Sequence, residues 1–163
     1  MIARALLIGA IMVSAGLLAA VAPLTDARSP AAASDGAVAV RSAYPMAEMV
    51  ERLKQDIASK GLTFFVAIEQ SKLAGDAGVK LRPSTLLIFG NPALGAQFIT
   101  SNPVAGLDWP VRLLVFQDES GAVWAAYTDF RWIARRHQIK DRDAAFGKAS
   151  EVIASITSSV RAR

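Results

Sequence analysis

The stretch formed by residues 81–95 constrains the fold of this chain more than any other. Within it, residues 85–89 are a short and continuously apolar run, which is typical of a central β-strand buried on both faces. Gly90-Asn91-Pro92 stops the run, and a helix is expected over residues 92–100. The block therefore predicts a buried strand, a tight turn and a helix start in direct succession.

The residues before this block predict two strands and two helices. Residues 37–44 alternate with the period of a strand, and residues 62–69 have the aromatic and β-branched composition of one. Between them, Pro45 opens a helix that ends at Lys60-Gly61. Its apolar stripe consists of Met46, Met49, Val50, Leu53 and Ile57. A second helix over residues 71–78 is weakened by its two glycines.

The residues after the block predict a β-hairpin and two helices. Apolar runs at residues 113–117 and 122–128 lie on either side of Asp118-Glu119-Ser120-Gly121. Asp129 can cap a helix that reaches residue 137, and residues 141–160 carry a second helical stripe. The whole order predicts an α+β fold: a two-layer sandwich of a roughly five-stranded mixed sheet with helices packed on one face.

The N-terminus has the pattern of a secretory signal. Residues 1–4 are a short basic region, and residues 5–22 are an unbroken apolar run. We expect a signal peptide over residues 1–27, a flexible tether over residues 28–36 and a single domain over residues 37–163. The protein is then exported, to the periplasm or outside the cell, and it meets a membrane only if the apolar run stays uncleaved as an anchor.

Composition excludes several kinds of chemistry. The chain has no cysteine, which rules out thiol catalysis, thiolate metal sites and disulfides. Five basic residues gather late in the chain: Arg131, Arg135, Arg136, Lys140 and Arg142. Acidic residues are interleaved with them and the net charge is only +4, so we predict a solvated surface and no nucleic-acid partner.

These segments together resemble the domain-of-unknown-function family 302, whose two-layer α+β fold is also called TT1751-like. The resemblance runs over residues 40–138 and rests on five segments: Gly61 with residues 64–69, residues 81–92, residues 106–111, the hairpin ending at Tyr127, and Arg136-His137. It implies the fold and a homodimer, and it implies no reaction. The chain departs from the family pattern at Gln70, where a histidine is common, and at Gln138, where a glycine is common.

Two candidate site residues follow predicted strands. Glu69 ends an apolar strand at a strand-to-helix turn, where ligand-binding groups often lie, although a capping and solvated cluster explains it as well. Asn91 begins the helix after the central strand. Backbone N–H groups there could receive an anion, but Pro92 removes one donor, and a helix cap is the simpler interpretation.

His137 is the only histidine and therefore the first suspect for a general base. It lies on an apolar helix face, which favours a structural role, and Asp141 is the only carboxylate at helical spacing from it. Asp108 and Arg112 are either a polar pair at a pocket rim or an ordinary loop ion pair. We predict no catalytic residue, metal site or cofactor, and name as candidate ligand-binding residues Glu69, Arg82, Asn91, Tyr127 and His137.

Three functions remain open. The first is a non-enzymatic exported module that binds a small ligand or a partner beside the central strands as a homodimer. The second is an enzyme that uses Glu69, Tyr127 or His137 for proton transfer in a shielded pocket. The third is a structural protein anchored in the cell envelope.

Overall fold

A computed structural model describes residues 36–163. The predicted signal segment, residues 1–27, lies outside the described residues, as does the tether apart from Gly36. The elements in chain order are β1 (Ala37–Arg41), α1 (Met46–Ser59), β2 (Thr63–Glu69), α2 (Gln70–Asp76), β3 (Ser84–Gly90), α3 (Pro92–Ser101), the 3-10 helix η2 (Pro103–Leu107), β4 (Val111–Gln117), β5 (Val123–Thr128), α4 (Phe130–Arg136) and α5 (Asp143–Ser158).

The strands form one five-stranded sheet in the order β1-β5-β4-β3-β2. This confirms the predicted α+β class. Every neighbouring pair is antiparallel, so the expected mixed sheet was wrong in that detail. The unit β1-α1-β2 does join strands of the same direction, but it places them at opposite edges with three strands between them. No parallel pair therefore forms.

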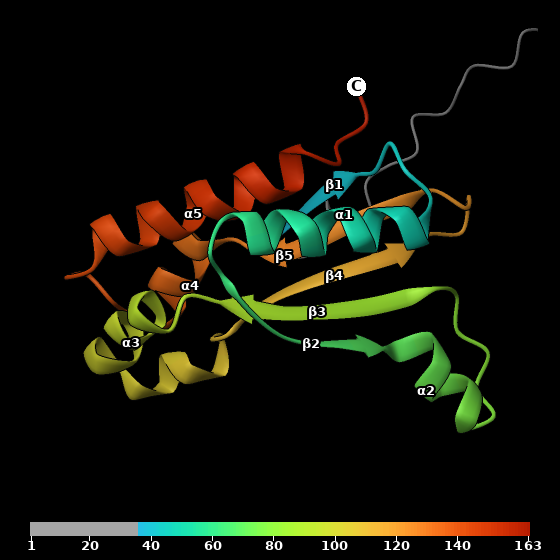
Figure 1. The fold of residues 1–163 in the computed structure, drawn as a ribbon. Coiled ribbons are helices and arrows are strands. Elements are labelled where there is room, and N and C mark those ends of the chain that lie inside the picture. The colour runs from blue at the N-terminus through green and yellow to red at the C-terminus, as the bar shows by residue number, and fades with distance from the viewer. Residues whose placement is uncertain (1–35) are drawn as a thin grey trace, which may run out of the picture.

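The two long helices α1 and α5 cover one face of the sheet (Figure 1). Met49, Leu53 and Ile57 of α1 are fully buried, and they form one core with Leu87 and Leu113. In both helices most of the buried residues belong to the apolar stripe that the sequence predicts, and this stripe faces the sheet. The core lies between the helices and this face.

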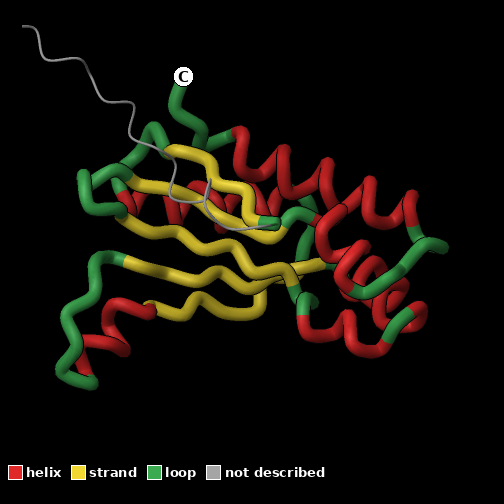
Figure 2. Tube along the Cα trace, turned by 180° about the vertical axis from the view of Figure 1, so that it is seen from behind, coloured by secondary structure: helices red, strands yellow, loops and turns green. Residues whose placement is uncertain are grey.

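From behind, the strands lie in front of the helices (Figure 2). Residues of β3 alternate across the sheet, so Leu87 and Phe89 are buried on the helix side while Leu86 and Ile88 are only half-buried. The expectation that β3 is buried on both faces is therefore met fully on one face only.

The short helices gather at the two ends of the sheet. At one end, α3, η2 and α4 lie close together, and α2 lies at the other (Figure 1). The 3-10 helix η2 follows α3 directly, and Asn102 caps its start by accepting a hydrogen bond from the backbone N–H of Val104 at 3.0 Å. The end that holds α3, η2 and α4 contains the features described next.

Candidate functional site

A cavity of about 140 Å³ opens where α5 crosses the end of β3 and the start of β4. It lies between the helix layer and the sheet, and its walls come from six parts of the chain. The described residues that line it are Lys60, Leu62, Phe89, Gly90, Asn91, Leu94, Trp109, Val111, Phe130, Lys148, Ala149, Val152 and Ile153. Most of these side chains are apolar, as in typical small-molecule sites.

Three polar side chains line the same cavity. Asn91 caps α3, because its Oδ1 accepts a hydrogen bond from the backbone N–H of Leu94 at 3.1 Å. Lys60 is already paired, since its Nζ donates to Asp56 Oδ1 at 2.9 Å. Lys148 is exposed on α5 and forms no ion pair with another described residue.

Trp109 forms one wall of the cavity, and two glycines make room for its indole ring. A Cβ atom on Gly90 would lie 2.6 Å from Trp109 Cζ2, and a Cβ atom on Gly95 would overlap the ring itself. Phe98 meets the indole edge-on, with ring centroids 6.1 Å apart. The glycines are therefore needed at these positions for close approach.

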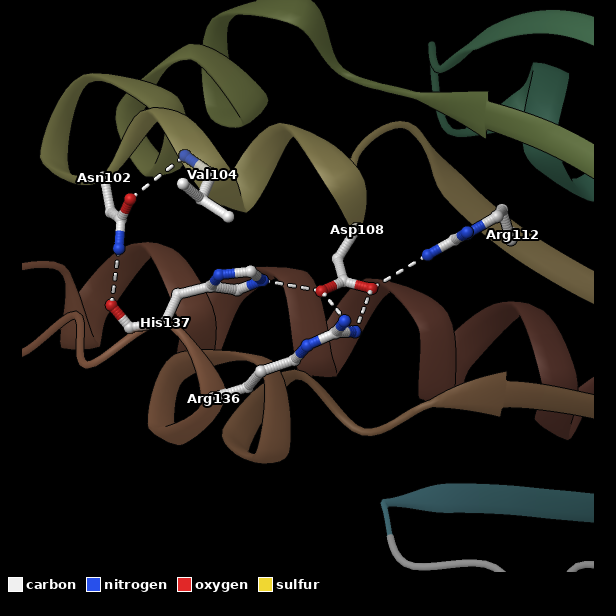
Figure 3. Close-up of polar contacts among 6 residues, drawn as sticks. All are labelled: Asn102, Val104, Asp108, Arg112, Arg136 and His137. Atoms are coloured by element: carbon white, nitrogen blue, oxygen red, sulfur yellow. Dashed lines mark hydrogen bonds and ion pairs between the residues drawn. The ribbon is translucent and has the colours of Figure 1, made fainter.

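The residue before Trp109 is a buried carboxylate that holds three cationic or polar partners. Asp108 accepts hydrogen bonds from Arg112 Nη2 at 2.8 Å and from Arg136 Nη1 at 3.1 and 3.2 Å (Figure 3). Its Oδ2 also lies 2.6 Å from His137 Nε2. We call Asp108, Arg112, Arg136 and His137 the Asp108 cluster; it joins the start of β4 to the end of α4.

Asn102 forms a second link between η2 and the end of α4. Its Nδ2 donates to the backbone oxygen of His137 at 2.9 Å, while its Oδ1 accepts from the backbone N–H of Val104 (Figure 3). The turn that carries Trp109 is thus bonded to α4 through Asp108 and through Asn102. These bonds fix one wall of the cavity.

The Asp108 cluster holds structure and is poorly placed for acid–base chemistry. The side chain of His137 is only 4% exposed, and its Nε2 is already paired with the Asp108 carboxylate. A general base must come within hydrogen-bond distance of a substrate proton, which this burial opposes. Asp108 and Arg112 also line a small cavity of about 10 Å³, which is the room needed by a single water molecule.

The structure does not bring Glu69, Tyr127 and His137 together. Glu69 is exposed on the edge strand β2 opposite Thr85, whereas Tyr127 lies on β5 opposite Leu113. The strands β3 and β4 lie between them, a separation of roughly 14 Å at about 4.8 Å per strand. Arg82 is exposed in the loop before β3, in a broad surface hollow with Phe116 and Asp118.

Of the five candidate residues, Asn91 alone is found in the lining of the cavity beside α5. Tyr127 lies in the small cavity beside Asp108, and burial, together with the nearby negative charge of Asp129, raises the pKa of its phenol. Asp141, the carboxylate at helical spacing from His137, instead accepts from Ser101 Oγ at 2.6 Å. That hydrogen bond lowers the pKa of Asp141.

Sequence reasoning missed Trp109 and Lys148 as cavity residues and Asp108 as the centre of a cluster. The sequence does carry one signal for Asp108, because Arg112 follows it at a spacing of four residues. It carries none for Arg136 and His137, which approach Asp108 only through the tertiary fold.

Curated relatives share part of their sequence with this chain. A protein of Brucella suis biovar 1 (strain 1330) named fluoride-specific ion channel FluC 1 is 38% identical over 104 residues, which are 64% of this chain and 41% of that protein. FluC 2 of Brucella melitensis biotype 1 is 38% identical over the same length, or 38% of that protein. This chain thus spans about two-fifths of these relatives.

No helix within residues 36–163 combines the length and apolar character that crossing a membrane requires.

Among solved structures, the uncharacterised conserved protein DUF302 from Bacillus stearothermophilus superposes with a TM-score of 0.71. The match covers 78% of this chain and all of that one, at 17% sequence identity, and so concerns the fold.

The family model described as domain of unknown function DUF302 matches residues 38–160, which contain both the cavity and the Asp108 cluster. The match includes the segments on which the sequence resemblance rests. The chain therefore belongs to the DUF302 family.

Proposed function

We propose that this protein is a non-enzymatic exported module that binds a small, mostly apolar ligand in the cavity beside α5. The observation that carries the proposal is the cavity of about 140 Å³ between α5 and the sheet. An apolar cavity of about 150 Å³ is large enough to bind benzene. The ligand is then a molecule with roughly one ring or a short branched chain.

The walls of the cavity support binding by a preformed site. Phe89 and Ile153 are almost fully buried, and Trp109 is held by the glycines and by the bonds of the Asp108 cluster. A pocket whose walls are fixed before binding loses little conformational entropy when the ligand enters.

The arrangement of titratable groups supports binding without catalysis. Glu69 and Tyr127 lie on strands separated by two others, and His137 is buried against Asp108. Proton transfer needs such groups within about 3 Å of the reacting atoms. The enzyme hypothesis therefore has less support than the binding hypothesis.

Export is part of the proposal and rests on the sequence. Arg4 gives the first residues a positive charge and residues 5–22 are apolar, as in a signal peptide, and the absence of cysteine suits any redox compartment. Mass spectrometry of the mature N-terminus tests this step. A mature terminus at about residue 28, after the predicted signal peptide, supports export, whereas an intact Met1 in the membrane fraction supports the envelope-anchored alternative.

The first experiment on binding is native mass spectrometry of the protein purified from its own host, followed by a screen of small apolar fragments. Ala149 is buried in the cavity wall, so Ala149→Leu fills part of the space. We expect a ligand that binds the unmodified protein and fails to bind this variant. Val152→Phe is a second filling variant, and Ala154→Leu, at an exposed position on the same helix, is the matched control.

The absence of any bound mass and any fragment would contradict the binding proposal. If fragments bind equally well to both filling variants, the site lies elsewhere on the molecule.

A second function has one observation in its favour, the name of the Brucella relatives. A segment similar to this chain forms about two-fifths of proteins named fluoride-specific ion channels. We propose on that ground that the domain serves as an accessory of a fluoride channel.

Fluoride efflux from vesicles tests this role in three forms of the Brucella suis protein: intact, with the similar segment deleted, and with that segment replaced by this chain. Lost flux that the replacement restores supports the role, and unchanged flux after deletion contradicts it.

We also propose that two copies of the chain form a homodimer through the edge strand β2. Phe64, Phe65 and Val66 of this strand are 36%, 48% and 44% exposed. Among the described residues β2 pairs with β3 alone, so one side of its backbone has no strand partner. A second copy offers the same apolar edge, and a two-fold axis can pair the two edges.

A further inference from the structure

We infer that the ligand of the cavity is a compact apolar monocarboxylate whose carboxylate lies against Lys148. This inference rests on the proposed function, because it names the chemical class of ligand for the same cavity. It follows from the charges of the cavity lining and from its volume.

The charge at the cavity is positive. Lys60 and Lys148 belong to the lining, and no acidic side chain is among the described residues that line it. Asp56 neutralises Lys60 through their 2.9 Å contact. Lys148 has no such partner among the described residues, although Glu151 lies one turn further along α5. One ammonium group, that of Lys148, is therefore free to contact an anionic ligand at the edge of the cavity.

A single uncompensated ammonium favours a ligand with a single negative charge. A carboxylate meets that requirement, and a charge-assisted hydrogen bond from an ammonium is stronger than one between neutral groups. Asn91 adds a second donor at the same cavity, because its Oδ1 is used by Leu94 while its side-chain N–H groups have no partner among the described residues. Both groups are exposed, so the carboxylate stays in contact with water.

The rest of the ligand must be apolar and small. The interior of the cavity is formed by side chains such as Phe89, Trp109 and Phe130, which offer no charge. Placing a charged group among them without a partner is strongly unfavourable, because the group loses its hydration and gains no hydrogen bond. A volume of about 140 Å³ accommodates one ring, as in phenylacetate. A ligand whose ring lies inside the cavity and whose carboxylate contacts Lys148 satisfies both the charge and the volume of the site.

Isothermal titration calorimetry with a matched pair of probes tests the inference. Phenylacetate and 2-phenylethanol have similar apolar bodies, and only the first carries a charge. We expect phenylacetate to bind about ten-fold more tightly, and this preference to shrink at high salt. In Lys148→Gln the preference should fall close to one. Lys140→Gln removes an exposed lysine outside the cavity and should leave the preference unchanged.

Each outcome has a separate meaning. Equal binding of the two probes to the unmodified protein overturns the inference but leaves the proposed function intact. A preference that survives in Lys148→Gln also overturns it, because the charge is then recognised elsewhere. If neither these probes nor the apolar fragments bind, the proposed function itself fails.

Discussion

Gly95 and Gly147 both lie inside helices, but their surroundings differ. A Cβ atom at Gly95 would overlap the indole ring of Trp109, whereas a Cβ atom at Gly147 would meet nothing within 4 Å. Alanine is the better helix former by about 0.5–1 kcal/mol. We therefore expect Gly147→Ala to raise the free energy of unfolding, and Gly95→Ala to lower it by about 1–3 kcal/mol through overpacking.

Urea denaturation of the two variants measures both values under one set of conditions. Tryptophan fluorescence gives a second readout, because a displaced Trp109 indole changes the emission while Trp124 and Trp132 contribute equally in both variants. If Gly95→Ala stabilises the protein as much as Gly147→Ala does, the close packing of Trp109 on α3 is wrong.

Tyr127 is the second residue whose surroundings make a testable prediction, here for the pKa of its phenol. Burial first, and then the charge of Asp129, raise the pKa of its phenol above the ordinary value of 10.0. A raised phenol pKa means that folding disfavours the phenolate. The associated stability is therefore complete below pH 10.0 and is lost as the pH rises through the raised pKa.

We expect the Tyr127 phenolate to absorb only above pH 10.0, and the chain has just one other tyrosine, Tyr44. Tyr127→Phe should therefore remove an absorbance change above pH 10.0 and flatten the loss of unfolding free energy there. If Tyr127→Phe removes an absorbance change at or below that pH, the phenol is not shielded as the structure shows.

Single residues were predicted best where their role is local. The sequence indicates Asn91 as a helix cap and Asp129 as another, and both accept the expected backbone hydrogen bonds. Such caps depend on neighbours three residues away at most. The partners of Asp108 and the cavity position of Lys148 depend on contacts between distant segments, which helical or strand periodicity cannot reveal.

At the scale of elements, the Asp108 cluster is the main polar link between the start of β4 and the end of α4. Removing Asp108 leaves the buried His137 without its Nε2 partner and two guanidinium groups without a carboxylate. We expect Asp108→Ala to lower the free energy of unfolding by about 3 kcal/mol. Arg112 is 48% exposed, so Arg112→Gln should cost about 1 kcal/mol or less.

Chemical denaturation measures these two costs, and their ratio is the informative quantity. Similar costs for Asp108→Ala and Arg112→Gln would mean that the cluster is no more than a surface ion pair. A loss of ligand binding in Asp108→Ala at temperatures where the variant is still folded would show that the cluster also positions Trp109.

The β4–β5 hairpin depends on a second carboxylate, that of Asp118. It accepts from Ser120 Oγ at 2.7 Å, from the backbone N–H groups of Ser120 and Ala122, and from Trp124 Nε1 at 2.7 Å. The hydrogen bond from the Ser120 side chain is the largest cause of its lowered pKa. The stability that follows is present above pH 3.8 and is lost as the pH falls through the lowered value.

Asp118→Asn should therefore lower the unfolding free energy by about 1 kcal/mol at neutral pH, where the carboxylate is charged. It should also reduce the loss of stability below pH 3.8. Urea titrations over a pH series of both proteins give the comparison. Parallel curves for the two proteins would mean that Asp118 does not contribute to the pH dependence.

The identity of most elements could be predicted because each has a strong local pattern. The bounds of α1 and of the β4–β5 hairpin were predicted to within a few residues, from the apolar stripe of the helix and the polar loop between the strands. Strand pairing was harder, because β1-α1-β2 has the local order of a parallel unit. Only the placement of three strands between β1 and β2 makes the sheet fully antiparallel, and that placement is a property of the whole chain.

At the scale of the whole molecule, the proposed homodimer follows from the edge strand β2. Exposed apolar edges promote pairing with another chain, so natural proteins cover or charge them. β2 carries no lysine or arginine, and Phe65 lies at the irregularity between Phe64 and Val66 in its pairing with β3. Glu69 at its last position is the one charged residue of this strand, and no other strand of the described chain covers its outer edge, which supports burial of the Phe64–Val66 segment against a second copy.

Phe65→Lys should therefore convert the dimer to a monomer, because the charge cannot be buried across the edge without a partner. Leu73→Lys is the matched control, since Leu73 is 58% exposed on α2. Light scattering after size-exclusion chromatography reports the mass of each variant. A dimer that survives in Phe65→Lys would place the contact on another surface, and a monomeric unmodified protein would contradict the homodimer. Because the cavity lies on the helix side of the sheet and the edge lies at β2, we expect the monomeric variant to keep its ligand affinity.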